Sequence, residues 1–278
     1  MGSEKWKKMS EKLNFDALSI LAEPFYIFTH TILSLLLPLS FLLLARLSTG
    51  QHIPSFTSSP TSTLSSLFLY AINPLLVQFL VSVVSVSALV HGLTGRFPSL
   101  SESVSRPRLY AAWVLLCSLQ VCVGLGLEET IVAGFWAVDY GNRTPLIRRL
   151  VFFLGLYQTM LHWSRTVVKP VVDDTVFGFE RDERWVERVA VGGCFGGLWW
   201  WKLRAEVEAL ALVVEVKREL LMDVGNAEIF GLWLYYMTVT VGWVRLVKGL
   251  IRLVDGAALL WPRPKPSNDC SCVDDAQV

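Results

Sequence analysis

The chain has 278 residues, of which 53% are hydrophobic and only 18% are charged. A soluble globular protein carries about 25% charged residues because its surface must be hydrated. This composition therefore excludes a soluble globular protein and indicates an integral membrane protein, whose first partner is the lipid bilayer. Lys and Arg (25) nearly balance Asp and Glu (24), so there is no basic field that would recruit nucleic acid.

A bilayer-crossing helix needs about 20 apolar residues, and a backbone in lipid must satisfy its own hydrogen bonds, which favours helices. We therefore predict an all-α, polytopic membrane helix bundle of about six transmembrane helices. The predicted spans are residues 26–47, 67–93, 109–127, 147–168, 186–203 and 229–247. The fifth span has Trp at both ends, which is typical of a crossing; a re-entrant or interfacial segment is the alternative.

Residues 1–25 form the predicted N-terminal tail, and 248–278 form an interfacial segment followed by a C-terminal tail. The lysines before the first apolar run are also typical of a signal peptide. However, that run exceeds 20 residues and ends in Ala45-Arg46-Leu47 without a small-x-small cleavage pattern, which favours a retained first span. Residues 205–222 alternate apolar and charged side chains, and form either an interfacial helix or an extension of the fifth span.

Lys and Arg are more frequent on the cytosolic side of membrane proteins. When the six spans alternate in direction, the termini and the connections on their side carry 17 Lys and Arg residues, and the opposite side carries 7. We therefore expect both termini in the cytosol, in the endomembrane system or the plasma membrane. Asn142 begins a sequon on the outer side, although Pro145 and the nearby membrane argue against glycosylation. Cys270 and Cys272 in the C-terminal tail are candidates for palmitoylation, with free thiols as the alternative.

Small residues let helices approach closely in lipid. In the fifth span, Gly192 with Gly196 and Gly193 with Gly197 form two overlapping G-x-x-x-G pairs, which predict tight packing on a neighbouring helix. The sixth span carries a predicted packing seam on one face, because its members recur every three or four residues. The seam consists of Gly231, Tyr235, Thr238, Gly242, Arg245 and Gly249.

One glutamine lies near the centre of each of the second, third and fourth spans: Gln78, Gln120 and Gln158. An unpaired amide costs several kcal/mol in hydrocarbon, so we expect all three side chains to point inward and to converge. Two hypotheses remain open. Either the glutamines join three helices by hydrogen bonds, or they line a polar cavity with His162, about one turn from Gln158 and able to titrate.

The sequence contains no H-E-x-x-H, G-x-S-x-G or P-loop motif, and its four histidines lie more than twenty residues apart. We therefore predict no enzyme, no cofactor and no metal site. The pair Asp173-Asp174 lies in a charge-mixed segment and is interpreted as a solvated turn rather than a catalytic dyad. Residues 179–188 are interpreted as a solvated helical turn through Glu180 and Arg184.

The stretches GLEETIVAGFWAVDY (126–140) and WSRTVVKP (163–170) resemble an uncharacterised plant family of multi-pass membrane proteins. The resemblance covers about half of the chain and implies no known activity. We expect a structural or accessory role in a membrane complex, with other membrane proteins as partners. A small transporter or channel is the alternative, although no internal repeat supports it; a lipid-modifying enzyme is the third hypothesis.

Overall fold

The computed structural model describes residues 2–50, 74–95, 106–132, 146–207 and 225–260, with residues 210, 214 and 218 between the last two ranges. These residues form helices and contain no strand, so the predicted all-α helix bundle is confirmed. The α-helices are α1 (Gly2–Gly50), α3 (Pro74–Thr94), α4 (Arg106–Val132), α5 (Leu146–Trp163), α6 (Lys169–Val176), α7 (Trp185–Leu198), α8 (Arg204–Glu206) and α10 (Asn226–Leu260). Two turns of π-helix, η1 (Ser164–Val168) and η2 (Trp199–Leu203), continue α5 and α7.

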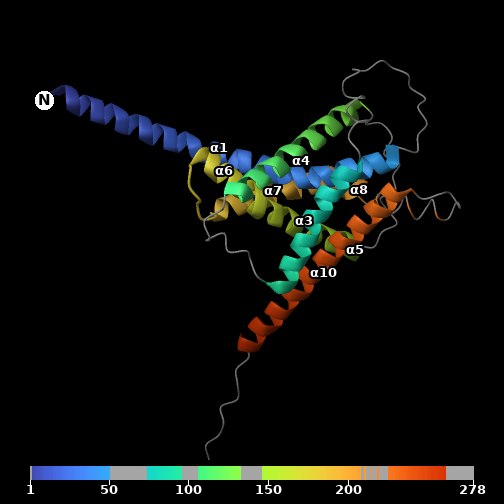
Figure 1. Ribbon diagram of the computed structural model, residues 1–278. Coiled ribbons are helices and arrows are strands. Elements are labelled where there is room, and N and C mark those ends of the chain that lie inside the picture. The colour runs from blue at the N-terminus through green and yellow to red at the C-terminus, as the bar shows by residue number, and fades with distance from the viewer. Residues whose placement is uncertain are drawn as a thin grey trace, which may run out of the picture.

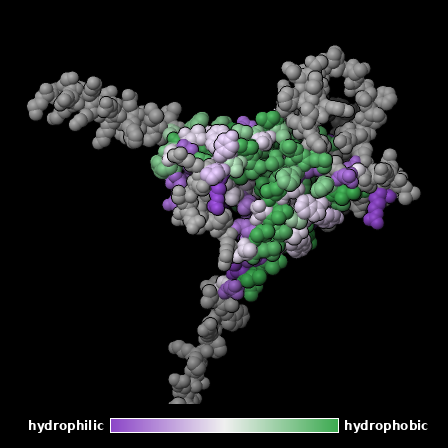
Figure 2. Space-filling view, viewed as in Figure 1, coloured by the Kyte–Doolittle hydropathy of each residue, from purple (hydrophilic) through white to green (hydrophobic). Residues whose placement is uncertain are grey.

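Among the described residues, three helical segments are long and apolar enough to cross a membrane: Ala22–Leu47 in α1, Leu75–Thr94 in α3 and Pro107–Gly124 in α4. Apolar side chains are exposed over the bundle, and Figure 2 shows them gathered across one face while most polar residues lie at its edges. Phe28 and Phe79, for example, are 65% and 67% exposed. An apolar surface of this extent is typical of a protein in contact with lipid.

Helices α5 and α10 pack against each other (Figure 1), and they approach at two glycines, Gly155 and Gly242. A β-carbon on Gly155 would lie 1.9 Å from the carbonyl oxygen of Thr238, and one on Gly242 would lie 2.0 Å from that of Val151. Backbone therefore packs directly on backbone here. The predicted seam on α10 is correct from Gly231 to Gly242, because these residues are buried, and wrong at Arg245 and Gly249, which are exposed.

A layer of aromatic rings fills the bundle beside this crossing. The ring of Phe152 in α5 stacks on Tyr235 of α10 at 4.8 Å and on Trp199 of η2 at 6.1 Å between centroids. It also meets the edge of Phe41 in α1 at 6.3 Å. Such ring pairs stabilise a core beyond the area they bury, so this layer connects four elements that are far apart in the sequence.

The glycine pairs of α7 do not pack as predicted. Only Gly192 has a close neighbour, since its β-carbon would lie 3.3 Å from the Tyr157 hydroxyl. No described atom lies within 4 Å of a β-carbon built on Gly193, Gly196 or Gly197. Against the described part of the chain, the predicted packing is therefore wrong for these three, because the helix buries Val191 and Phe195 instead.

Some predictions concern the connections between helices and the C-terminal tail. Asn142, Cys270 and Cys272 lie outside the described residues, so what was predicted for their modification stays a prediction. Helix α8 follows η2 directly, and residues 210, 214 and 218 are also helical. Residues 250–260 continue α10 without a break, and the C-terminal part of α10 projects from the bundle (Figure 1).

Candidate functional site

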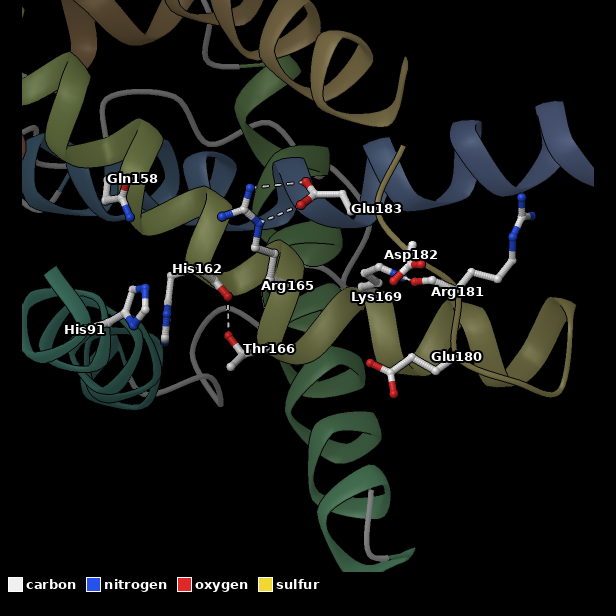
Figure 3. A pocket seen from close by; sticks show the side chains of 10 residues that line it. All are labelled: His91, Gln158, His162, Arg165, Thr166, Lys169, Glu180, Arg181, Asp182 and Glu183. Atoms are coloured by element: carbon white, nitrogen blue, oxygen red, sulfur yellow. Dashed lines mark hydrogen bonds and ion pairs between the residues drawn. The ribbon is translucent and has the colours of Figure 1, made fainter. Parts of the chain in front are cut away.

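A polar cavity of about 180 Å³ lies where α5 passes into η1, beside the last turn of α3. Helices α3, α5 and α6, the π-turn η1 and the segment after α6 supply its lining (Figure 3). The residues that line it are His91, Gln158, His162, Arg165, Thr166, Lys169, Glu180, Arg181, Asp182 and Glu183. The predicted cavity beside Gln158 and His162 is thus present, but the other two glutamines are not part of it.

Pro170 explains why the wall of the cavity changes its helical geometry here. A proline inside a helix has no N–H to donate, and its ring clashes with the carbonyl one turn earlier. The chain widens to a π-turn over Ser164–Val168, in which the Lys169 N–H donates to the Ser164 carbonyl five residues before. Such turns often occur at functional sites.

His91 of α3 and His162 of α5 face each other across the cavity, with ring centroids 5.8 Å apart (Figure 3). His91 is buried, and Gln158 lies about one turn from His162. Sequence analysis missed this pair because 71 positions separate the two histidines. The alternation of spans offered a usable signal, since the second and fourth spans run in the same direction and each has its histidine near the same end.

The acidic and basic side chains at the mouth of the cavity largely neutralise each other. Arg165 donates to both carboxylate oxygens of Glu183, at 3.1 and 3.3 Å. Arg184 donates to Glu23 of α1 at 2.7 Å. Residues 180–184 contain no helix, so the predicted solvated helical turn is wrong: this segment is extended, and its arginines pair with acids elsewhere in the chain.

Asp173 is buried, with 1% of its surface exposed, and therefore does not lie in the solvated turn predicted for it. Its carboxylate accepts a hydrogen bond from Lys169 at 2.5 Å and from the backbone N–H of Arg181 at 3.2 Å. Lys169 also donates to the Arg181 carbonyl. Asp174 is exposed, so the two carboxylates face different surroundings and do not form a dyad.

A second buried polar group connects α1 to the π-turn. The Ser164 hydroxyl lies 2.9 Å from His30 Nε2 and accepts a hydrogen bond from the Ser34 hydroxyl, also at 2.9 Å. The Tyr26 ring stacks on His30 with a 5.8 Å centroid distance. Hydrogen-bonded groups of this kind fix one arrangement of neighbouring helices, and no sequence pattern predicted this one.

The three glutamines do not converge. Gln78 is buried beside Gly231, with its amide nitrogen 4.0 Å from a β-carbon built there. Gln158 lines a cavity together with Val241, which lies ten residues after Gly231 in α10. At about 1.5 Å per residue, Gly231 and Val241 lie about 15 Å apart along α10. The prediction of a common polar centre is therefore wrong.

Gln120 is exposed, which corrects the prediction that it points inward. Helix α4 buries an apolar stripe of Leu116, Leu119 and Val123. The exposed face beside this stripe carries Tyr110, Trp113, Cys117, Gln120 and Gly124. The rotation of α4 thus follows the packing of the stripe on neighbouring helices, which in lipid depends on van der Waals contact rather than on removal from water.

Among the described residues, no group of three His, Cys, Asp or Glu side chains is arranged to hold a metal ion. The chemistry that the cavity offers is hydrogen bonding and weak electrostatic attraction from imidazole, amide and guanidinium groups. No family model matches the sequence, and no curated protein and no solved structure is detectably similar to it.

Proposed function

We propose that the chain is a six-span integral membrane protein in which α5 with η1, α7 with η2, and α10 cross the bilayer beside α1, α3 and α4. Residues 146–168 and 185–203 are each continuously helical, and at about 1.5 Å per residue they reach roughly 34 and 28 Å. Both lengths approach the roughly 30 Å of hydrocarbon. Moreover, α5 packs against α1, α3 and α10, so it shares their environment.

The charge asymmetry of the sequence supports cytosolic termini, which places the cavity at the cytosolic end. Helix α5 then runs toward the cytosol, and its last residues contribute His162 and Arg165 to that end. The proposal assigns the chain to the endomembrane system or the plasma membrane and includes the resemblance to the plant membrane family. It assigns no enzymatic activity.

Within this arrangement we propose that the protein is a structural or accessory subunit of a membrane complex. The position of Gln120 is the observation that supports this role. Its amide lies on the exposed face of α4, inside the apolar stretch Pro107–Gly124. An amide that faces hydrocarbon without a partner costs several kcal/mol. A hydrogen bond to a helix of another subunit removes that cost, and polar side chains join membrane helices in this way.

Replacing Gln120 by Leu should weaken the complex about 3- to 30-fold, because an interhelical hydrogen bond in lipid contributes roughly 0.6 to 2 kcal/mol. The measurement is the apparent mass of the protein extracted from its native membrane in mild detergent. We expect the variant to shift toward the monomer. Ser118→Ala is the matched control, because the Ser118 hydroxyl already donates to Val114 of its own helix. An undiminished complex for Gln120→Leu would refute the accessory role.

A small transporter is the second candidate, and the cavity that contains Gln158 and the two histidines favours it. The same helices oppose a continuous path, however, because α5 and α10 touch at Gly155 and Gly242 on the other side of Gln158. Flux into liposomes separates the two candidates: transport that Gln158→Leu abolishes without loss of assembly would favour the transporter.

A further inference from the structure

A second, smaller cavity of about 70 Å³ lies between the last turns of α3 and the middle of α10. This volume is large enough for several water molecules. Three cations of α10 line it, Arg245, Lys248 and Arg252, which recur at spacings of three and four and so share one helix face. His91 and Gly95 close it on the α3 side.

Among the residues that the structure describes, these cations have no acidic partner. Within the described chain, none of the three forms an ion pair with a carboxylate, and Asp255, the nearest acid on α10, is exposed. The mouth of the first cavity differs, since Arg165 there is paired with Glu183. A cluster of three unneutralised cations beside a cavity is electrostatically suited to an anion.

The carbonyl end of α3 accounts for only one of the cations. Lys248 donates to the Leu93 carbonyl at 3.3 Å, and a helix C-terminus attracts positive charge in this way. Gly95, with φ of 68°, ends the helix, and its N–H donates to the His91 carbonyl. Arg245 and Arg252 lie one turn to either side of Lys248 and satisfy no carbonyl that is described.

The opposite face of the same helix is apolar. Val247, Leu250, Ile251 and Val254 are between 47% and 66% exposed. A helix with cations on one face and exposed aliphatic side chains on the other is suited to a membrane interface, where the aliphatic face meets acyl chains and the cations meet headgroups.

We propose that the cleft between the end of α3 and α10 binds the phosphate group of an anionic lipid of the cytosolic leaflet, held by Arg245 and Arg252. The assignment to that leaflet rests on the proposed orientation, whereas the phosphate site itself does not. Arginine suits the role because its planar fork of donors matches two phosphate oxygens at once. Lys248 adds charge to the site while it remains bonded to α3.

Native mass spectrometry of the purified full-length protein, titrated with phosphatidic acid, tests the proposal. We expect one bound lipid per protein. Arg245→Gln/Arg252→Gln should bind it roughly tenfold to thirtyfold more weakly, since each cation near an anionic headgroup strengthens binding by about three- to fivefold. Arg245→Lys/Arg252→Lys keeps the charges but loses the planar fork of donors, so it should bind more weakly than the wild type and more tightly than the Gln variant. An unfolding midpoint of the Gln variant equal to that of the wild type shows that its loss is not misfolding. Lys202→Gln/Arg204→Gln, which removes one cation from η2 and one from α8, is the matched control and should bind like the wild type.

Inorganic phosphate identifies the source of the ligand. If inorganic phosphate displaces the lipid and its binding also depends on Arg245 and Arg252, the site binds phosphate groups in general. If inorganic phosphate neither binds nor displaces the lipid at millimolar concentration, the site is specific for the lipid. Both results support the site. Equal binding by the Gln variant and the matched control, or equal binding of phosphatidylcholine, would overturn it. Lipid binding in detergent requires neither a partner subunit nor cytosolic termini, so the lipid site can be confirmed even if the proposed function is wrong.

Discussion

Gly155→Ala and Gly242→Ala should each destabilise the protein by about 3 kcal/mol or more. Added core volume costs about 1 to 3 kcal/mol where neighbouring side chains can adjust, and occasionally more. Here the neighbours are backbone carbonyl oxygens, 1.9 and 2.0 Å from the new methyl group. No rotamer change relieves such a clash, so α5 and α10 must separate. The measurement is the free energy of unfolding of the purified protein in mixed micelles.

Gly193→Ala is the matched control for this prediction. It introduces the same methyl group into a helix at a position with no described atom within 4 Å. We expect stability that is unchanged or up to about 1 kcal/mol higher, because Ala favours helix over Gly. The double variant Gly155→Ala/Gly242→Ala should cost less than the sum of the single variants, since one separation relieves both clashes. Equal stability of Gly155→Ala and Gly193→Ala would refute the close crossing.

Lys169→Met should cost about 3 to 5 kcal/mol, because it leaves the carboxylate of Asp173 buried without its cation. The two groups lie 2.5 Å apart, and their side chains are only 10% and 2% exposed. Lys169→Met/Asp173→Leu should recover most of the loss, since replacing both members of a buried pair is often close to neutral. Unfolding in mixed micelles measures both variants.

An exposed ion pair in the same region provides the comparison. Arg188 lies 3.3 Å from Glu183, but 56% of the Arg188 side chain is exposed, and such pairs contribute about 0 to 1 kcal/mol. Arg188→Met should therefore change stability little. A cost for Lys169→Met as small as that for Arg188→Met would mean that Asp173 is hydrated rather than buried.

Sequence patterns predicted the all-α fold and one side of the main packing contact, for reasons that are local. Apolar length determines where a helix can lie in a bilayer, and small residues repeated at helical spacing mark where two helices touch. The prediction of the seam through Gly231 and Gly242 depended on spacing within one helix, and α10 buries both residues. The partner of Gly242, which is Gly155, is the single glycine of its predicted span, so no glycine pair marked it for packing.

The failures arose where the rotation or register of whole helices decides the outcome. Gln120 was expected to turn inward because amides avoid lipid, but α4 instead packs the apolar stripe of Leu116, Leu119 and Val123 against its neighbours. His91 and His162 meet because α3 and α5 pack in a particular register; the sequence places each histidine near the same end of its predicted span but does not specify that register. Asp173 is buried because a later segment, around Arg181, folds back over it.

The number of membrane crossings is the central claim, and the positions of the two termini test it most directly. An even number of crossings places both termini on one side, whereas α1, α3 and α4 alone would place them on opposite sides. Epitope tags at both ends, probed by protease in sealed right-side-out and inside-out vesicles, measure this. We predict that both tags are cleaved only where the cytosolic face is accessible. One protected tag and one cleaved tag in the same vesicles would contradict the six-span arrangement.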